Sequence, residues 1–419
     1  MSSSREVDLL RSLDDEPDSP SMVDVRRAIV TARRRRTQRA AGYAGAAAMT
    51  ALAVTGGFLV AAPGRTQQAP VAASPSVTTT PPAYSVPGLP NWTAAAATAP
   101  SSCVLDRLPV PDDEPKSLVS GADPTGRYIV GRSYLRRGGY QAVLWRDGRA
   151  EKVMLPGNRE ESLQDVNTSG VAVGWSYAND GSDHDAPVPY AYRDGKVIKL
   201  PGIRSGSAYA INDAGAIVGD DNAGHPVVWP SPVATPFRLP VPAGVRKAYA
   251  RGIDETGTVV GSLDLRRPYV WFADGTHREL PLPSLDGKQA VMSQAFGVRN
   301  GWVTGMASPD DVSARGSNIA DARLWAVRWN LRTGEVAVTA ALRTPADAVN
   351  AQGWQVGTDP QGYEVLVTSS GVVRLPDLAD HAPDGLSTIA TALSDDGRTI
   401  AGQSDTAAGL IQAVVWHCR

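Results

Sequence analysis

Short apolar runs alternate with polar turns from about residue 117 to the end of the chain, and this arrangement repeats seven times. Each copy reads approximately apolar–Asn/Asp–x–x–Gly–x–apolar–x–Gly, then a gap, Ala–x–x–Trp, a turn and Leu–Pro. A near-constant period of about 45 residues predicts a repeat architecture. The second glycine of the successive copies stands at Gly131, Gly174, Gly219, Gly261, Gly305, Gly357 and Gly402.

One copy contains two hairpins. In the third copy, small and β-branched residues flank the turn Asn212–Gly215, where Asn and Asp bend the chain and Gly supplies positive φ. The second hairpin turns at Asp–Gly, as at Asp194-Gly195 in the second copy. The last strand ends in Leu–Pro, as at Leu200-Pro201, which suits an edge strand. Four strands in about 45 residues describe a propeller blade.

The recurring glycine and tryptophan positions are interpreted as structural. Glycine permits a close backbone approach, and tryptophan fills the space between blades. No copy shows a helical period, so a helical solenoid is disfavoured. We therefore predict an all-β fold, a seven-bladed β-propeller over 103–419, preceded by a transmembrane helix and a disordered linker.

The last copy is incomplete, which indicates how the ring closes. It stops at 416–419 without its turn and its fourth strand. A matching strand that ends in Leu–Pro precedes the first copy, at 103–109. We predict that this segment pairs with 412–416 and completes the seventh blade.

The two cysteines of the chain fall at the corner where the seventh blade lacks its turn. Counted from the neighbouring Leu–Pro and Trp positions, Cys103 and Cys418 occupy the places that Gly195 and Asp194 hold in the second copy. We predict a disulfide that restores the missing covalent connection at this corner. The alternative is two unrelated free thiols.

The N-terminal hundred residues have a different composition. Residues 41–62 carry no charge and are long enough to cross a bilayer as a helix. The arginines at 33–39 favour a cytoplasmic N-terminus and an extracellular propeller. We predict a single-pass anchor in the cell membrane, with 1–40 as a short cytoplasmic tail. A cleaved signal peptide is the alternative.

Residues 63–102 are rich in Pro, Ala, Ser and Thr. Such a stretch lacks the apolar area needed to fold alone, so we predict a disordered linker that spaces the propeller from the membrane. The tail 1–40 is interpreted as a solvated segment with a topology signal. The alternative is a docking segment for a cytoplasmic partner.

Composition and motifs favour binding over catalysis. The net charge of −2 gives no support for a nucleic-acid partner. The chain contains neither a Gly-x-Ser-x-Gly elbow nor a phosphate-binding Gly-Lys-Ser/Thr, and its five histidines lack metal-ligand spacing. We therefore expect no enzyme activity, no cofactor and no metal site. The acidic stretch 179–185 could hold a hard cation such as calcium, although a solvated loop is the preferred interpretation.

Candidate binding residues come from the loops between second and third strands, which vary in length among the copies. Variable loops on a rigid frame are where binding usually resides. They combine aromatic side chains with charges of both signs, which suits an extracellular glycan or protein ligand. The candidates are Trp175, Tyr177, Asp183 and Asp185 in the second copy and Arg266 and Arg267 in the fourth.

The repeated Ile/Val-Asn/Asp-x-x-Gly-x-x-Val-Gly, with Ala-x-x-Trp and Leu-Pro, resembles the HAF-repeat proteins. These are bacterial, largely extracellular, propeller-like proteins. The resemblance covers about 117–419 and implies no catalytic residue. The fifth and sixth copies depart from it, since Ala341-Leu342 replaces Leu-Pro and Val367 stands near the expected Trp. The Arg-rich anchor with its Pro/Thr spacer resembles surface proteins of high-GC Gram-positive bacteria.

Three functional hypotheses follow. The first is a membrane-tethered extracytoplasmic β-propeller that acts as a binding or scaffold module. The second is a transmembrane sensor whose cytoplasmic tail docks a regulator such as a sigma factor. The third is a propeller enzyme that acts on glycans, which would require paired carboxylates at the ring centre.

Overall fold

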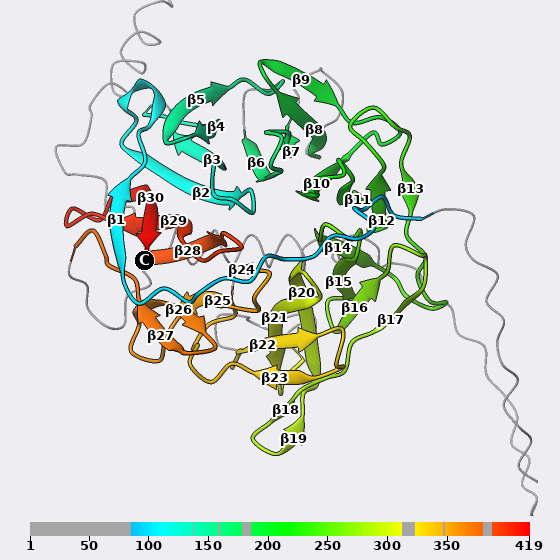
Figure 1. Cartoon of the computed structure of the whole chain (residues 1–419). Helices are drawn as coiled ribbons and strands as arrows, with labels where there is room; N and C mark the ends of the chain where they lie inside the picture. The colour runs from blue at the N-terminus through cyan, green and yellow to red at the C-terminus, as the bar shows by residue number, and fades with distance from the viewer. Residues whose placement is uncertain are drawn as a thin grey trace, which may run out of the picture.

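The computed structural model describes residues 85–136, 138–157, 160–177, 186–311, 323–346, 348–379 and 388–419. Seven four-stranded antiparallel sheets stand around a common axis as the blades of a propeller (Figure 1). The all-β, seven-bladed prediction is confirmed. The predicted tail 1–40 and membrane segment 41–62 lie outside the described residues, and no helix long and apolar enough to span a bilayer occurs within the described ones.

Within blades 1 to 6 the strands follow in chain order from the ring axis outward, and in blade 7 the outermost strand comes from the N-terminal side of the ring. Blade 1 contains β2 (Lys116–Ala122), β3 (Tyr128–Tyr134), β4 (Tyr140–Arg146) and β5 (Arg149–Val153). Blade 2 contains β6 (Glu161–Val166), β7 (Ala172–Ser176), β8 (Val188–Arg193) and β9 (Lys196–Lys199). Blade 3 contains β10 (Gly206–Ile211), β11 (Ile217–Asp221), β12 (Pro226–Trp229) and β13 (Phe237–Arg238). Blade 4 contains β14 (Ala248–Ile253), β15 (Val259–Leu263), β16 (Arg267–Trp271) and β17 (His277–Glu279).

The remaining blades follow the same order. Blade 5 contains β20 (Met292–Arg299), β21 (Trp302–Ser308), β22 (Trp325–Asn330) and β23 (Val336–Val338). Blade 6 contains β24 (Ala348–Val349), β25 (Gln355–Thr358), β26 (Glu364–Thr368) and β27 (Gly371–Arg374). Blade 7 contains β28 (Thr388–Leu393), β29 (Thr399–Asp405), β30 (Ile411–Cys418) and β1 (Cys103–Arg107). A short 3-10 turn η1 (Pro111–Asp113) and a small hairpin of β18 (Ser284–Leu285) and β19 (Lys288–Gln289) are additions to this plan.

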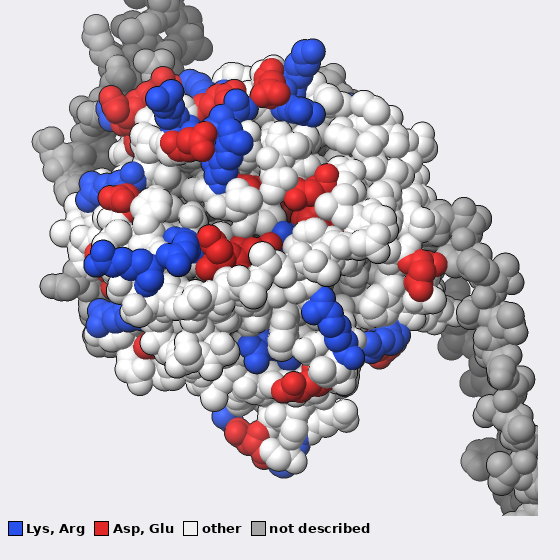
Figure 2. Space-filling model, in the orientation of Figure 1, with Lys and Arg blue, Asp and Glu red and all other residues white. Residues whose placement is uncertain are grey.

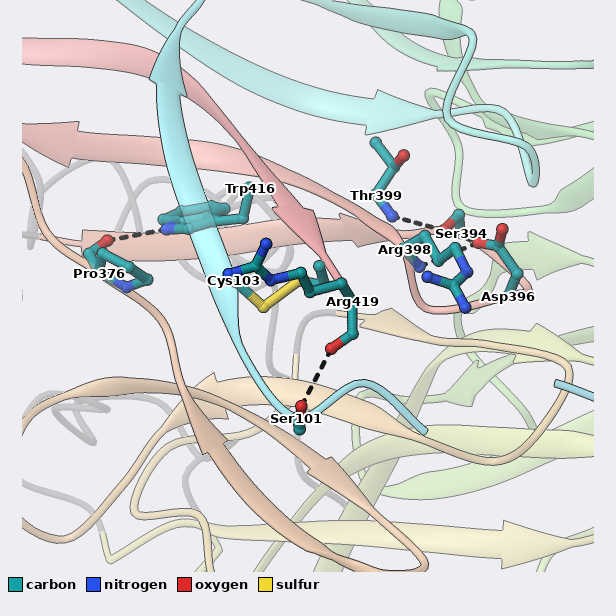
Figure 3. Close-up of a disulfide and its surroundings, with 10 residues drawn as sticks. Ser101, Cys103, Pro376, Ser394, Asp396, Arg398, Thr399, Trp416 and Arg419 are labelled. Atoms are coloured by element: carbon teal, nitrogen blue, oxygen red, sulfur yellow. Dashed lines mark hydrogen bonds between the residues drawn. A yellow bond between two sulfur atoms is a disulfide. The ribbon is translucent and has the colours of Figure 1, made fainter. Parts of the chain in front are cut away.

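The ring closes as the sequence predicts. β1 pairs with β30, with Cys103 opposite Cys418 and Leu105 opposite Trp416. The two cysteines form the predicted disulfide across a sequence separation of 315 residues (Figure 3). The Ser101 hydroxyl also donates to the Arg419 carbonyl at 3.3 Å. The first and last strands of the propeller are thus held together at the corner where a complete blade has a turn.

The glycine in the second strand of a blade marks a close backbone approach, as predicted. A Cβ atom added at Gly219 would lie 1.9 Å from the Ser207 carbonyl oxygen, and one at Gly261 would lie 1.7 Å from that of Tyr249. These are impossible contacts, so any larger residue would push the first strand away from the second. The same close approach occurs at Gly131, Gly174, Gly305 and Gly402.

The Leu–Pro pair has a different role from the predicted one. It follows the outer strand instead of forming its edge, and its proline carbonyl accepts a hydrogen bond from the tryptophan Nε1 of the next blade. Trp271, for example, is fully buried and donates to Pro240 at 2.6 Å. The repeat thus ties neighbouring blades together with a buried polar contact. The other such pairs are Trp145 with Pro109, Trp229 with Pro201, Trp329 with Pro281 and Trp416 with Pro376.

The Asn of the first turn also connects blades. The Asn212 Oδ1 accepts the Ala216 N–H at 2.9 Å, which shapes the turn, while its Nδ2 donates to the Asp254 carbonyl of blade 4 at 3.1 Å. Asn167 and Asn350 make equivalent pairs of contacts. We name the side of the ring that carries these turns the turn face, and the opposite side, with the longer loops, the loop face.

Residues 85–102 correct the linker prediction. This segment, here called the strap, crosses the turn face from blade 4 to blade 7 (Figure 1). Val86 is 3% exposed, and its N–H donates to the Ala273 carbonyl at 3.1 Å. Farther along, the Ala95 carbonyl accepts from Gln352 Nε2 at 2.7 Å. The strap is ordered because the ring supplies apolar contacts and hydrogen-bond partners that its own composition lacks. Residues 63–84 of the predicted linker lie outside the described residues.

Candidate functional site

The innermost strand of a blade carries a β-bulge that turns one side chain toward the ring axis. A regular strand directs its side chains to the two faces of the sheet, which here pack on neighbouring blades, whereas a bulge re-aims a residue. All of these bulged residues are partly exposed, although most residues beside them are buried. In blade 6 the equivalent position, Asp347, lies outside the described residues. The bulged residues are Ser120, Gln164, Tyr209, Arg251, Phe296 and Thr391.

Arg251 lies at the boundary between blades 3 and 4. Its guanidinium carbon stands 4.3 Å from the ring centre of Tyr209 and 5.3 Å from that of Tyr249. Its guanidinium also donates a hydrogen bond to the Tyr209 hydroxyl and interacts electrostatically with the Asp220 carboxyl, although no carboxylate of the described residues lies within ion-pair distance. The cation is therefore held against two aromatic faces, which offset part of the cost of its burial.

The surroundings of Arg251 shift the pKa values of its neighbours. Burial raises the pKa of Asp220 to about 6, although Arg251 and a hydrogen bond from Tyr209 oppose the rise. Burial also raises the pKa of Tyr249 to about 12. For Arg251, burial lowers the pKa, but its interactions with Tyr209 and Asp220 outweigh this effect, so that its pKa is raised overall. Arg251 is thus a permanent cation beside a carboxyl that titrates near neutral pH.

A second charged cluster, beneath the strap, is fully paired. Arg299 of blade 5 donates to Glu255 of blade 4 at 2.5 Å and, through Nε and Nη2, to both oxygens of Asp395 in blade 7. The Trp92 ring of the strap stacks on the same guanidinium at 4.8 Å. Acidic and basic side chains meet near the middle of this face in Figure 2.

This second cluster joins blades 4, 5 and 7 and is interpreted as structural. Burial raises the pKa of Glu255, while Arg299 partly offsets the rise. Burial likewise raises the pKa of Asp165, on β6, to about 7. All three nitrogens of the Arg299 guanidinium donate to carboxylates, so its charge is neutralised within the protein and little of it is left for an added ligand.

The sequence-predicted site residues are placed as two separate groups. Trp175 and Tyr177 of blade 2 are partly exposed and pack edge-to-face, with ring centres 5.6 Å apart. Asp183 and Asp185 lie outside the described residues. Both predicted arginines of blade 4 are paired: Arg266 with Asp311 at 3.2 Å, and Arg267 with Glu279 at 2.6 Å. Blade 3 stands between the two groups, and their role in binding stays a prediction.

The bulged residues were missed in the sequence, although a signal for them exists. Tyr209 stands three residues before Asn212, and Arg251 stands three residues before Asp254. At this position the copies differ widely in chemistry, whereas the flanking positions, apart from Asp165, are small or apolar. A position that varies inside an otherwise uniform strand indicates a side chain outside the packing between blades.

Other features offer less chemistry. A shallow depression of about 340 Å³ beside β13 is lined by Ile203, Arg204, Asp221 and Arg238, among others. Its carboxylate is already bound by His225 Nδ1 at 2.8 Å and by Arg238 at 3.0 Å. Across the described segments, no group of His, Cys, Asp or Glu side chains is arranged to hold a metal ion.

Comparisons with known proteins leave the family open. No family model matches the chain, and no curated protein matches it. The resemblance to HAF-repeat proteins therefore stays a prediction. One similar solved structure is that of "YCF48 bound to D1 peptide", with 10% sequence identity, a TM-score of 0.41, and coverage of 77% of this chain and 98% of that one. A likeness at this level carries no argument about ligands.

Proposed function

We propose that this protein is a membrane-tethered, extracytoplasmic β-propeller that acts as a binding module and takes its ligand from the loop face. The observation that carries the proposal is the asymmetry between the two faces. The chain's own strap occupies the middle of the turn face, while bulges aim side chains of different chemistry at the ring axis. A rigid ring that presents varied side chains at its centre is suited to binding.

The strap supports an orientation as well as a binding face. Its N-terminal end is held by Val86 and Leu89 on blade 4, and the chain before it leads to the predicted membrane segment 41–62. A tether attached to the turn face leaves the loop face directed away from the membrane. In this arrangement the ligands that could reach the loop face are extracellular glycans or proteins.

The glycan-enzyme hypothesis receives less support. Its requirement is a pair of carboxylates that converge at the ring centre with room for a sugar. The carboxylates of Glu255 and Asp395 do converge, but Arg299 binds both of them and Trp92 of the strap covers the guanidinium. The sensor hypothesis depends on residues 1–40, so it is tested by whether those residues capture a cytoplasmic regulator.

The binding face is tested with matched aromatic substitutions. Purified protein is assayed against solubilised cell-wall polysaccharides and secreted proteins, and any ligand found is titrated with Trp175→Ala and with Trp302→Ala. Trp175 belongs to the predicted loop-face site, whereas Trp302 packs on Gly353 and Arg328 at the turn face. We expect at least a tenfold loss of affinity with the first variant and little change with the second. The reverse pattern would overturn the choice of face.

The tether is tested separately. A reporter fused after Arg419 should be active only if it functions outside the cytoplasm, and the protein should remain in the membrane fraction after a high-salt wash. A mature N-terminus near residues 63–75 would instead show that the segment 41–62 is removed, and would refute the anchor.

A further inference from the structure

We propose that Arg251 is the anchor of an anion site at the ring axis, and that the group it binds is the carboxylate of a sugar acid. This inference rests on the proposed binding function and specifies its chemistry. Neither the sequence motifs nor the comparisons assign a role to this residue. The contrast between the two inward-facing arginines, Arg251 and Arg299, carries the argument.

Arg299 shows how this fold neutralises a buried guanidinium. Its nitrogens reach two carboxylates, at 2.5 Å for Glu255 and 2.6 Å for Asp395. Arg251 has no such ion pair among the described residues, although burial opposes its charge as well. A guanidinium has five N–H donors in a planar fork, and an aromatic face satisfies none of them fully. Arg251 gives one of these donors to the Tyr209 hydroxyl, and the remaining donors of the fork are those that a planar acceptor such as a carboxylate would bind.

The carboxylates that interact electrostatically with Arg251 and with its neighbour Tyr249, Asp220 and Asp264, are engaged elsewhere. Asp220, on β11, is 8% exposed and accepts a hydrogen bond from the Tyr209 hydroxyl. Asp264 accepts the backbone N–H groups of Arg246 and Lys247, at 3.1 and 3.0 Å. The Lys247 side chain interacts electrostatically with the same Asp220 carboxyl, and burial lowers its pKa. Arg251 is thus left without a carboxylate that binds it directly among the described residues.

The residues around Arg251 suit a sugar better than an inorganic anion. Tyr209, which is partly exposed, lies beside the guanidinium, and aromatic rings pack well on the apolar faces of sugars. The bulged residues of blades 1, 2 and 7 are Ser120, Gln164 and Thr391. Gln164 Nε2 donates to Ser162 Oγ and Thr391 Oγ1 to the Val119 carbonyl, and their oxygen atoms can still accept hydrogen bonds from sugar hydroxyls. A planar guanidinium, an exposed tyrosine ring and neutral polar groups together suit a carboxylated sugar.

The test uses the full-length protein in detergent with glucuronate as the probe, glucose as its neutral counterpart and sulfate as a non-sugar anion. Binding is measured by calorimetry. We expect glucuronate to bind at least tenfold more tightly than glucose, and Arg251→Gln to remove this difference. Arg146→Gln, at an exposed pair with Asp194 on the turn face, is the matched control and should bind as the unmodified protein does. Asp220→Asn should strengthen glucuronate binding severalfold at pH 7.5, since it removes the competing negative charge.

The outcomes separate the site from the wider function. Unchanged glucuronate binding in a folded Arg251→Gln variant, or equal binding of glucuronate and glucose, overturns the site. Binding of sulfate but not of glucuronate overturns the sugar acid as the ligand. If Arg251→Gln does not fold, Arg251→Lys decides, because it keeps the charge but loses the planar fork and should bind at least threefold more weakly. If Arg251→Gln leaves glucuronate binding unchanged while a ligand that depends on Trp175 still binds, the anion site is refuted and the proposed binding function stands.

Discussion

A substitution at Asn212 tests how the turns of neighbouring blades are joined. Asn212→Asp keeps the shape of the side chain and keeps Oδ1, which accepts the Ala216 N–H. It replaces Nδ2, which donates to the Pro87 carbonyl of the strap at 2.9 Å and to the Asp254 carbonyl of blade 4 at 3.1 Å. Since the residue is fully buried, water cannot take over either contact.

The expected loss of stability has two parts. Two neutral hydrogen bonds disappear, at about 1 kcal/mol each. The buried Asp254 carbonyl and the half-buried Pro87 carbonyl are then left facing a carboxylate oxygen, which adds about 1–3 kcal/mol. We expect the free energy of unfolding to fall by about 3–5 kcal/mol at pH 8. The strap should also become more sensitive to protease, because its contact at Pro87 is lost.

The pH dependence gives the substitution a signature. In the folded variant, burial and the two carbonyls raise the pKa of the new carboxyl above its unfolded value of about 3.9. A group with a raised folded pKa favours folding when it is protonated, so the loss is smallest near pH 4 and grows as pH rises through the folded pKa. Urea unfolding followed by tryptophan fluorescence at pH 5 and pH 8 measures this difference.

The chain offers a reciprocal control at Asp254. There Oδ1 accepts the N–H groups of Thr256 and Thr258, while the buried Oδ2 has no hydrogen-bond partner among the described residues. Asp254→Asn should therefore leave stability unchanged or raise it by up to about 1 kcal/mol. If Asn212→Asp proves as stable as the unmodified protein at pH 8, or if both substitutions cost the same, the account of the turns is wrong.

Three further predictions concern the ring itself. Cys103→Ser with Cys418→Ser should lower the melting temperature, because chain entropy assigns the 315-residue disulfide loop up to about 5–6 kcal/mol; equal melting of oxidised and reduced protein would contradict this. Trp271→Phe should cost about 2–4 kcal/mol in urea unfolding, since it removes the 2.6 Å bond to Pro240 and leaves a cavity, and a cost below 1 kcal/mol would argue against the link between blades. Because the pKa of Asp165 is about 7 when folded and lower when unfolded, its contribution to stability is lost as pH rises toward 8; Asp165→Asn should flatten this decline, and an unchanged slope would refute it.

Two differences between the sequence-based expectations and the fold have a common origin. Composition places the strap in a disordered linker, because such a segment cannot form a core. It is nevertheless ordered, since the turn face offers Val86 a buried position and Trp92 a guanidinium to stack on. Similarly, the sequence pattern suggests that Pro240 is tolerated because it lies on an edge strand. In the fold, its carbonyl accepts a hydrogen bond from Trp271 of the next blade. In both cases the partner lies in another blade, which local pattern does not reveal.

The sequence by itself determined the number of blades, the two hairpins in each blade, the strand that closes the ring and the pairing of Cys103 with Cys418. These features depend on local turn chemistry and on a repeat that aligns each copy with the next, and both can be read along one chain. Only the tertiary structure decided which side chains meet at the axis. Arg251, at the bulge of blade 4, contacts two tyrosines, one of them from blade 3, whereas Arg299, at the end of β20, binds carboxylates from blades 4 and 7. Closure of the ring brings those partners together. A pattern within one copy does not encode which residues of other blades lie beside it, so the sequence does not reveal these contacts.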